Sequence, residues 1–494
     1  MYRALSIAAL FLLLLTGCAG VTGNLNTSST GQPQIKSIGT HYKKSLMDIG
    51  EVQDRKRQQS SDLGLIYNKE FETYANEILS KLKRVSGMAD IPGRVYLKAV
   101  RAWHANVTVS GNIYIPIYML EQIESEDVFA ALLAHELSHV IYNHADSELF
   151  MEVCKKGASV AAIAYQYSKG SDTAKDYYLN SLRVYTAAEL FLNPAWTRSQ
   201  EREADLLALD LLVRAGYSLG AMEEFLTEVV PKWENYNKSE KHKQQEELMA
   251  QQAKIELAST SVSLDITGFT DKSISFVESL TRDHHTAEDR ANELFEYVDT
   301  HYSTWPRTNY SSKEWLELKG SEGLIKVREG LDDIYNARDY LGKREYRKAE
   351  RATLGGYNPY TKDQSFLRIV FAQIRGAQGN SFKSIKNHEL ALNGMYPSFA
   401  SEMTVFRSKL DREQDQDVRV NLLDNILTIF ADYGTPSEYY SPLIDIADKL
   451  MQTGSATALR AKCAAKHAGE GVNCGASQQQ ASESKVNLRT LLGI

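Results

Sequence analysis

The residues best suited to chemistry are two histidines and a glutamate, His135, Glu136 and His139, in the order His-Glu-x-x-His. In an α-helix, residues four positions apart lie one turn above each other, so the two imidazoles share a face and can bind one metal ion. Glu136 lies about 100° further around such a helix, where its carboxylate can act as a general base toward a water molecule. The pattern predicts a zinc site with hydrolytic chemistry.

The surroundings of this pattern decide how much weight it carries. A His-Glu-x-x-His match arises by chance on the order of one or two times per hundred chains of this length and histidine content. Here it lies among apolar residues from Val128 to Ile141, in a segment that would otherwise be wholly buried. Burying two unpaired imidazoles and a carboxylate costs on the order of several kcal/mol, so we expect a cation to accompany them. A polar cluster that is satisfied without a metal is the alternative.

Three acidic residues near the start of a second amphipathic helix can complete the site: Glu201, Glu203 and Asp205. A hydrolytic zinc site takes three protein ligands, and a carboxylate would be the third. Glu201 and Asp205 are four positions apart and share a helix face, so one can bind the metal while the other accepts the free ring N–H of a ligating histidine. Glu203 is expected to point elsewhere. A solvated acidic face at a helix N-terminus is the alternative.

The elements that carry these residues follow from hydrophobic period and capping. Ser125 predicts the N-cap of a helix that continues to His144. Another helix is expected over residues 68–85. Between the two, residues 93–118 change to the pattern of short strands, and nearly everything after Ser125 is helical. The sequence therefore predicts a mainly α fold in which a small sheet packs on many helices.

The two motifs, residues 135–139 and residues 201–205, together resemble metallopeptidase family forty-eight, the gluzincins that include HtpX, the CAAX prenyl proteases and the Oma-type proteases. The resemblance covers residues 63–305 and implies a zincin-type metalloprotease domain that holds one Zn2+ per chain. The site roles that it implies are zinc ligands His135, His139 and Glu201, catalytic general base Glu136, and Asp205 as the support of a ligating histidine. With a lipobox-like sequence in front and helical repeats behind, the chain is most similar to the BepA-like periplasmic branch.

A third match implies a further ligand. Members of the family often carry His-Pro followed by an Arg five positions after the Pro, and residues 283–290 fit with His284 and Arg290, while His285 stands where the Pro is usual. The resemblance implies His284 as a candidate fourth metal ligand that holds a closed, latent state; a surface loop histidine is the alternative. The segment over residues 106–118 is implied as the sheet edge on which an extended substrate pairs.

The first residues of the chain indicate export. A positive charge, an apolar run and small residues before Cys18 predict a signal peptide over residues 1–17. The stretch before Cys18 resembles a bacterial lipobox, which implies lipidation of Cys18, a periplasmic location and, because Ala19 follows, the outer membrane; a plain secreted protein is the alternative. Residues 18–62 are rich in Gly, Ser, Thr, Gln and charge and are expected to be a tether.

Three further cysteines bear on the oxidising compartment that export implies. An odd number suggests one disulfide and one leftover thiol. We expect Cys463 and Cys474, which are close in sequence, to be paired, and Cys154 to be a buried small hydrophobic residue.

The C-terminal part predicts a helical domain over residues 306–475. Turn-like segments recur there around Pro359, Pro397 and Pro436, with the prolines 38 and 39 residues apart. Two helical patterns lie between the first two prolines, which is typical of an α-solenoid with TPR-like repeats; an irregular helical domain is the alternative. Concave helical surfaces suit protein partners. Residues 476–494 are expected to be a polar tail.

Length and charge narrow the function further. The 494 residues carry 56 Lys and Arg against 63 Asp and Glu, a formal charge of -7 without a long basic run, so a nucleic-acid partner is not expected. Together with the resemblance, this predicts a zinc metalloendopeptidase that degrades unfolded or misassembled envelope proteins in the quality control of outer-membrane proteins. The expected partners are such substrates and the outer-membrane assembly machinery. The alternatives are a non-catalytic chaperone or assembly scaffold that retains the zinc site, and a zinc amidase acting on cell-wall peptides.

Overall fold

The computed structural model describes residues 32–44, 50–60, 62–144, 198–233, 235, 286–306, 310–466 and 474. This part of the chain forms two compact units, which meet in the sequence between Thr404 and Val405. It is mainly helical with a small mixed sheet, which confirms the expected fold class. Several expectations fall on residues outside the described ones: the signal peptide over 1–17, Cys18, Cys154, His284 and the polar tail over 476–494.

Four short strands form the sheet, in the order β1-β2-β4-β3. They span Leu65–Ile66 (β1), Val95–Lys98 (β2), Asn106–Val107 (β3) and Ile113–Pro116 (β4). β2 and β4 run parallel in the centre, and β1 and β3 are the antiparallel edges. We expected the whole segment over 106–118 to be an edge, and this is wrong. A tight turn at Gly111, whose φ is +82°, folds the segment back so that β4 pairs on both sides and only β3 is an edge there.

The first unit, up to Thr404, contains the helices that matter for the candidate site. Before the site these are η1 Gln34–Lys36, α2 Glu51–Gln59, α3 Lys69–Ser86 and η2 Ile117–Gln122. Around the site they are α4 Glu126–Ile141, α7 Arg198–Arg214, α8 Gly220–Glu224 with a π-helical turn over Phe225–Val229, and α11 Ala287–His301. After it come α12 Lys313–Lys319, α13 Glu322–Gly342, α14 Tyr346–Gly355, α15 Ser365–Ala377, α16 Ser381–Leu392 and α17 Phe399–Arg412, which continues into the second unit.

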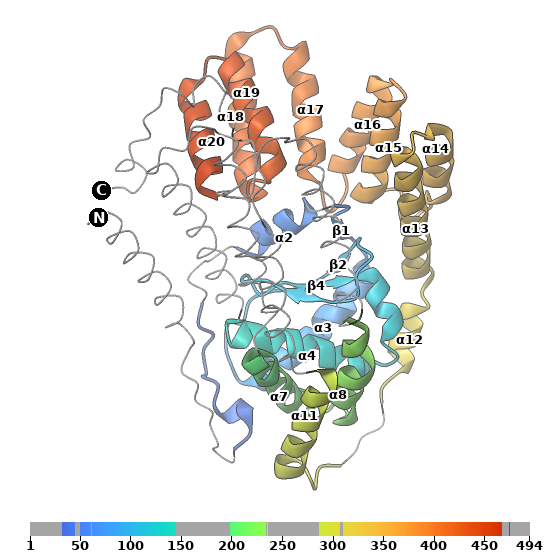
Figure 1. Ribbon diagram of the computed structural model, residues 1–494, viewed down its shortest axis with the longest axis vertical. Helices are drawn as coiled ribbons and strands as arrows, with labels where there is room; N and C mark the ends of the chain where they lie inside the picture. Colours follow the sequence, from blue (N-terminus) through green and yellow to red (C-terminus); the bar gives the residue numbers. More distant parts are fainter. Residues whose placement is uncertain are drawn as a thin grey trace, which may run out of the picture. The chain divides into compact units, whose positions relative to one another are not determined.

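Helices α3 and α4 begin where their capping residues predict. Asn68 and Ser125 are the N-caps, and each side chain accepts a hydrogen bond from the backbone N–H three residues further on, at 2.8 and 3.2 Å. α4 packs against α3, α7 and α8 (Figure 1). It is buried on all sides from Asp127 to Ile141, rather than along one apolar face. Every polar side chain on α4 must therefore find a partner inside the protein.

A continuous hydrophobic core runs through the first unit and holds α4. Phe129 of α4 stacks on Trp315 of α12 with ring centroids 4.5 Å apart, and the indole N–H donates to the Ile123 carbonyl at 2.8 Å. The core includes residues on both sides of the domain limit that we expected between residues 305 and 306, and that limit stays a prediction.

Asp127 fixes the N-terminus of α4 by polar contacts. Its carboxylate accepts hydrogen bonds from the backbone N–H groups of Ser218, before α8, and Ser311, before α12, at 2.6 and 2.7 Å. These two segments are therefore attached to the first turn of the helix that carries His135 and His139.

Part of the segment that we expected to be a tether is folded onto the sheet. Within residues 18–62, the buried Asp54 of α2 accepts four hydrogen bonds through one carboxylate oxygen. The donors, at 2.7 to 3.0 Å, are the hydroxyls of Thr108, Ser110 and Tyr114 and the amide of Asn112. The expectation is therefore wrong for residues 51–59, because their polar composition, which suggested a linker, is paired with polar groups of the sheet.

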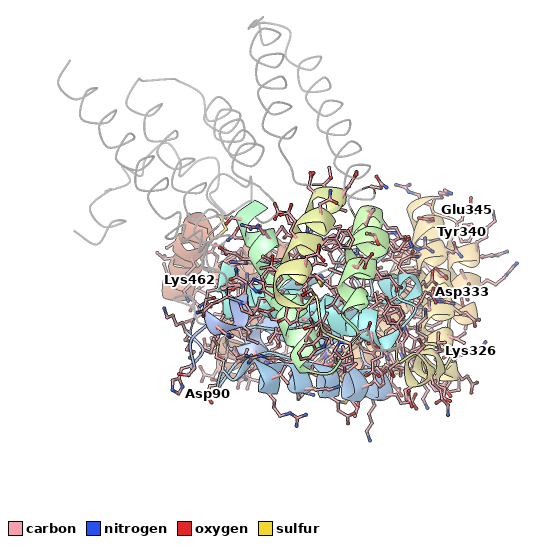
Figure 2. All side chains as sticks on the ribbon, turned by 90° about the horizontal axis from the view of Figure 1, so that it is seen from below. Asp90, Lys326, Asp333, Tyr340, Glu345 and Lys462 are labelled. Atoms are coloured by element: carbon pink, nitrogen blue, oxygen red, sulfur yellow. A yellow bond between two sulfur atoms is a disulfide. The ribbon has the colours of Figure 1, made fainter. Side chains whose placement is uncertain are left out.

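The C-terminal helices of the first unit pack in pairs, α13 against α14 and α15 against α16. Gly379, at a φ of +77°, and the N-cap Asn380 make the turn between α15 and α16 that the sequence predicts. Polar side chains such as Lys326, Asp333 and Tyr340 follow one another along α13 (Figure 2). The helix pairs are those that the sequence predicts, while their description as TPR-like repeats stays a prediction.

Gln364 and Tyr396 connect this helical region to the sheet. The Gln364 side chain donates to the Tyr67 carbonyl at 2.7 Å and accepts from the Tyr67 N–H at 3.0 Å, as a neighbouring strand would. The Tyr396 hydroxyl donates to Glu72 at 2.6 Å, and its ring packs edge-on against Tyr96 of β2. Directional polar contacts therefore hold the helical region in a defined position on the sheet.

The second unit follows α17 and is also helical. Its elements are α18 Gln416–Asp432, η4 Ser437–Tyr439, α19 Tyr440–Lys449 and α20 Thr453–Lys466. A disulfide joins Cys463 to Cys474, which confirms the expected pairing. Among the residues that the structure describes, no helix combines the length and the apolar character needed to cross a membrane.

Candidate metal centre

Three side chains from two helices converge in the first unit: His135 and His139 from α4 and Glu201 from α7. The Nε2 atoms of the two imidazoles lie 3.1 Å apart. The Glu201 carboxylate faces them, with Oε2 at 3.7 Å from the His135 Nε2 and Oε1 at 3.6 Å from the His139 Nε2. In the described part of the chain, these are the side chains whose ligand atoms lie close enough, within 4.8 Å of one another, to hold a metal ion.

The separations fit a zinc ion. A tetrahedral zinc with ligand bonds of about 2.0–2.2 Å places its ligand atoms about 3.3–3.6 Å from one another. The observed separations, from 3.1 to 3.7 Å, bracket that value. Two imidazoles and one carboxylate are also the donor set of hydrolytic zinc sites, which keep a fourth position open. Both histidines are buried, whereas 18% of the Glu201 side chain is exposed.

Asp205 supports His135 through the ring nitrogen that faces away from the cluster. Its Oδ1 lies 2.9 Å from the His135 Nδ1, and this close contact with a carboxylate favours the ring proton on Nδ1, which leaves the Nε2 lone pair for the cluster. Burial lowers the pKa of His135, but the carboxylates of Asp205 and Glu201 outweigh burial and raise that pKa above its ordinary value. Burial raises the pKa of Asp205, but Arg290 and His135 outweigh burial and lower it. Asp205 is therefore ionised in the folded protein.

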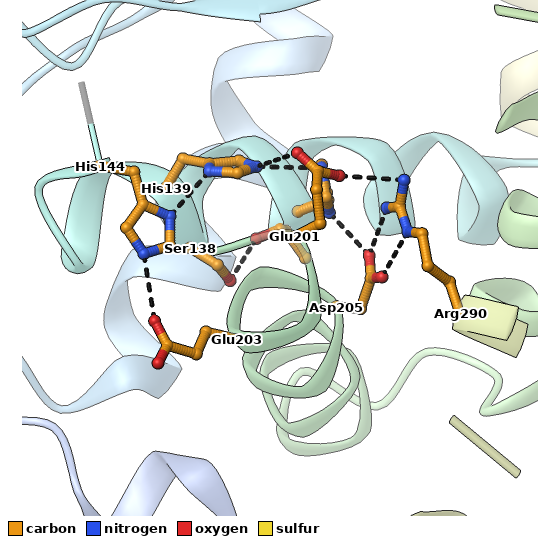
Figure 3. A network of polar contacts seen from close by, with 9 residues as sticks. Ser138, His139, His144, Glu201, Glu203, Asp205 and Arg290 are labelled. Atoms are coloured by element: carbon orange, nitrogen blue, oxygen red, sulfur yellow. Dashed lines mark hydrogen bonds and ion pairs between the residues drawn. The ribbon is translucent and has the colours of Figure 1, made fainter. Parts of the chain in front are cut away.

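Arg290 of α11 connects the two carboxylates of α7. Its Nε and Nη2 donate to Asp205 at 2.8 Å each, and its Nη1 lies 2.9 Å from the Glu201 Oε2 (Figure 3). A capping box between Thr286 and Asp289 starts α11 just before this residue. The sequence match that contained Arg290 gave it no role, and the structure shows that it orders both acids. His284, from the same match, lies outside the described residues.

His139 has a different support, which sequence reasoning missed. The Nδ1 of His139 lies 2.9 Å from the Nδ1 of His144, and the Nε2 of His144 lies 3.3 Å from the Glu203 Oε2 (Figure 3). Burial, together with the neighbouring His135 and His144, lowers the pKa of His139 well below its ordinary value, so the ring is neutral. Glu203 points away from the cluster, as expected, and contacts His144 instead.

Glu136 is buried next to the cluster, with 3% of its surface exposed. Burial raises the pKa of Glu136 to about 7, with His135 opposing this shift and Glu201 adding to it. A carboxyl group with a pKa near neutrality can both accept and release a proton at physiological pH, which is what general acid–base chemistry requires.

Phe225 closes one side of His135 and was also missed. The two ring centroids lie 5.6 Å apart, and Phe225 is the first residue of the π-helical turn that follows α8. Short π-helical turns occur frequently at functional sites. The hydrophobic pattern around Phe225 predicts a helix, but it carries no signal for the π-helical turn that begins there.

Comparison with known proteins agrees with this geometry. Residues 72–309 match the model of peptidase family M48. The chain is 25% identical over 223 residues to the Beta-barrel assembly-enhancing protease of Yersinia pestis, a match that covers 43% of this chain and 44% of that protein. It is 26% identical over 110 residues to the "Putative beta-barrel assembly-enhancing protease" of Vibrio cholerae serotype O1, which covers 22% of each.

The chain therefore spans less than half the length of these two relatives. The matched segment nevertheless contains His135, His139 and Glu201, the three side chains that converge in the structure. The resemblance that the motifs indicate is confirmed, because the match to peptidase family M48 covers both of them.

Proposed function

We propose that this chain is a zinc-dependent endopeptidase that cleaves unfolded or misassembled proteins of the bacterial envelope. The observation that carries the proposal is the convergence of His135, His139 and Glu201, whose ligand atoms lie within 4.8 Å of one another, next to the buried Glu136. The match of residues 72–309 to a peptidase family supports the same chemistry.

In this proposal His135, His139 and Glu201 hold one zinc ion. When bound, zinc polarises the scissile carbonyl and acidifies a water molecule. Asp205 keeps the His135 ring in one orientation, and Arg290 keeps Asp205 and Glu201 in place. The ligands are therefore positioned before the metal arrives, which reduces the reorganisation that binding requires.

Glu136 would move the proton. Its carboxylate takes a proton from the attacking water as the water oxygen bonds to the carbonyl carbon. It then gives this proton to the amide nitrogen as the carbon–nitrogen bond breaks.

The edge strand β3 would position the substrate. β3 lies at an edge of the sheet and packs against α4, so a peptide that pairs with Asn106–Val107 runs alongside the helix that carries the two histidines. Pairing of this kind needs an extended backbone, which a compact folded domain does not offer. This supports unfolded or misassembled chains as substrates.

Sequence features support a place in the envelope. The predicted signal peptide and the lipobox-like sequence at Cys18 support an outer-membrane lipoprotein that faces the periplasm. The two relatives are named as enzymes that enhance β-barrel assembly, which supports outer-membrane proteins as substrates and the outer-membrane assembly machinery as a partner. The helix pairs α13–α14 and α15–α16 would provide the surface that recruits them.

Zinc content and casein cleavage by the full chain test the proposal. We expect one zinc ion per chain, cleavage that stops on chelation and returns with zinc, and a loss of about 10²–10⁴-fold in cleavage rate for Glu136→Gln with its zinc retained. The matched control is Glu72→Gln, because Glu72 is another buried glutamate but is bonded to Tyr396 rather than to the cluster.

Two outcomes would contradict the proposal. A Glu136→Gln variant that binds zinc and cleaves casein like the parent would remove Glu136 from the mechanism. A parent that binds zinc, cleaves nothing and still prevents the aggregation of an unfolded client would favour the non-catalytic chaperone or scaffold.

A further inference from the structure

We propose that His144 and Glu203 are positioning residues that hold His139 in the one tautomer able to bind a metal through Nε2. The inference rests on the proposed zinc site and adds to it a relay of two hydrogen bonds. His139 Nδ1 lies 2.9 Å from His144 Nδ1, and His144 Nε2 lies 3.3 Å from Glu203 Oε2. His139 and His144 are buried, and Glu203 is 41% exposed, so the relay runs from the cluster to the surface.

Counting protons gives the direction of the relay. A neutral imidazole has one N–H and one lone pair, and a carboxylate only accepts. The bond to Glu203 therefore needs a His144 proton on Nε2, and in the neutral form of the ring this leaves a lone pair on the His144 Nδ1. The bond between the two rings then needs the His139 proton on Nδ1. As a result, the His139 Nε2 keeps a lone pair that faces the cluster, which is the form that a metal ligand requires.

Three acidic residues at every second position of helix α7 therefore each contact a part of the site. Glu201 faces the metal position, and Asp205, one turn later on the same face, binds the His135 ring directly. Glu203 lies about 200° around the helix from Glu201, too far around to contact His139 itself. His144 spans this gap. The Nδ1 of His135 therefore contacts a carboxylate of α7 directly, and the Nδ1 of His139 is connected to one through His144.

The turn after α4 holds His144 in place. Asn143 has a φ of +55°, and its side chain accepts from the Tyr42 hydroxyl at 3.1 Å and donates to the Lys43 carbonyl at 2.8 Å. The ring of Tyr142 stacks on that of His144, with centroids 5.4 Å apart and planes 18° apart. Backbone and side-chain contacts therefore restrict where the His144 ring can lie.

Four variants of the full chain separate positioning from packing. His144→Leu removes both hydrogen bonds, whereas His144→Gln keeps one acceptor and one donor. Glu203→Lys replaces an acceptor by a donor, so it favours the reversed relay with the His139 proton on Nε2. The matched control is His388→Leu, because His388 is a buried histidine bonded to Ser401 and not to the cluster.

Two measurements are needed for each variant: zinc affinity by competition with a chromogenic chelator, and the His139 tautomer by long-range 1H–15N NMR of histidine-labelled, metal-free protein. We expect His144→Leu and Glu203→Lys to weaken zinc binding about 10–100-fold. In the metal-free parent and in His144→Gln, His139 should carry its proton on Nδ1. In His144→Leu the ring should be a mixture of the two neutral tautomers, and in Glu203→Lys it should carry its proton on Nε2. His388→Leu should match the parent in both measurements.

The proposal is overturned if His144→Leu and Glu203→Lys bind zinc like the parent, or if zinc binding weakens while the His139 tautomer stays unchanged, which would be a plain charge effect. Should His144→Leu fail to fold, Glu203→Lys decides alone, because the Glu203 side chain is 41% exposed. The tautomer measurement needs no metal. A parent that binds no zinc would defeat the proposed function, while its His139 tautomer would still support or overturn the relay.

Discussion

Arg290 binds Asp205 through a planar fork, with Nε to Oδ2 and Nη2 to Oδ1 both at 2.8 Å. Both residues are buried, at 8% and 2% exposure, and they are 85 positions apart in the sequence. Bidentate pairs of this kind constrain direction as well as distance. Because Asp205 also binds the His135 ring, the orientation of a candidate metal ligand depends on how α11 packs against α7.

Replacing Arg290 by Met should remove the bidentate cationic partner of the buried Asp205 carboxylate. We expect the free energy of unfolding of the metal-free protein to fall by about 3–5 kcal/mol, and Arg290→Lys to recover only part of this because an ammonium group cannot form the fork. Urea unfolding followed by circular dichroism measures both. The control is Arg338→Met, whose pair with Asp62 is exposed at 40% and 45% and should cost below about 1 kcal/mol. Equal losses at the two arginines would contradict the assigned role.

Asp54 should be the residue that attaches α2 to the sheet. Asp54→Ala removes the acceptor of four hydrogen bonds, and we expect a loss of about 2–4 kcal/mol, since some of the freed donors can pair with one another. Hydrogen exchange should become faster throughout residues 51–59. Val52→Ala tests the same helix on its outer side, where Val52 is 60% exposed, and should leave exchange unchanged. Slow exchange in Asp54→Ala would show that other contacts hold α2.

Local spacing explains which parts of the site the sequence predicts. His135 and His139 are one turn apart on any helix, and the cap at Ser125 places the start of that helix, so neither statement needs tertiary structure. The third ligand required more, because spacing offered either Glu201 or Asp205 and only the family resemblance selected Glu201. The structure brings Glu201 together with the two histidines. The predicted roles of these residues await the measurements described above.

The features that were missed depend on contacts between distant segments. Asp54 and its neighbours have the composition of a linker, and nothing in hydropathy shows that their polar groups pair with the sheet. Arg290 meets its partner across 85 positions. His144 carried a weak local signal, since it stands five positions after His139 at the end of a buried helix. Its function depends on Glu203, which the helix period alone places away from the cluster.

His388 should make stability depend on pH. The residue is 8% exposed, and burial lowers the pKa of His388 to about 4, against an ordinary value of about 6.5 in the unfolded chain. The unfolded state therefore binds the proton more readily. The contribution of His388 is complete above pH 6.5 and is lost as the pH falls toward 4, by up to about 3 kcal/mol. The free energy of unfolding of His388→Gln should fall less steeply with decreasing pH over this range than that of the parent. Equal slopes for the two proteins would show that folding does not lower the pKa of His388.

The disulfide between Cys463 and Cys474 should stabilise the second unit by restricting its unfolded state. The two cysteines are 11 positions apart, and closing a loop of that length is worth about 3 kcal/mol in the chain-entropy model. Because Cys463 is fully buried, alanine is the better replacement, and Cys463→Ala with Cys474→Ala should speed hydrogen exchange in α19 and α20. Reductant should bring the parent to the same exchange rates and leave the double variant unchanged. Exchange that is equally slow in the oxidised parent and in the double variant would mean that helix packing alone, through residues such as Leu443 and Ile444, sets the stability of this unit.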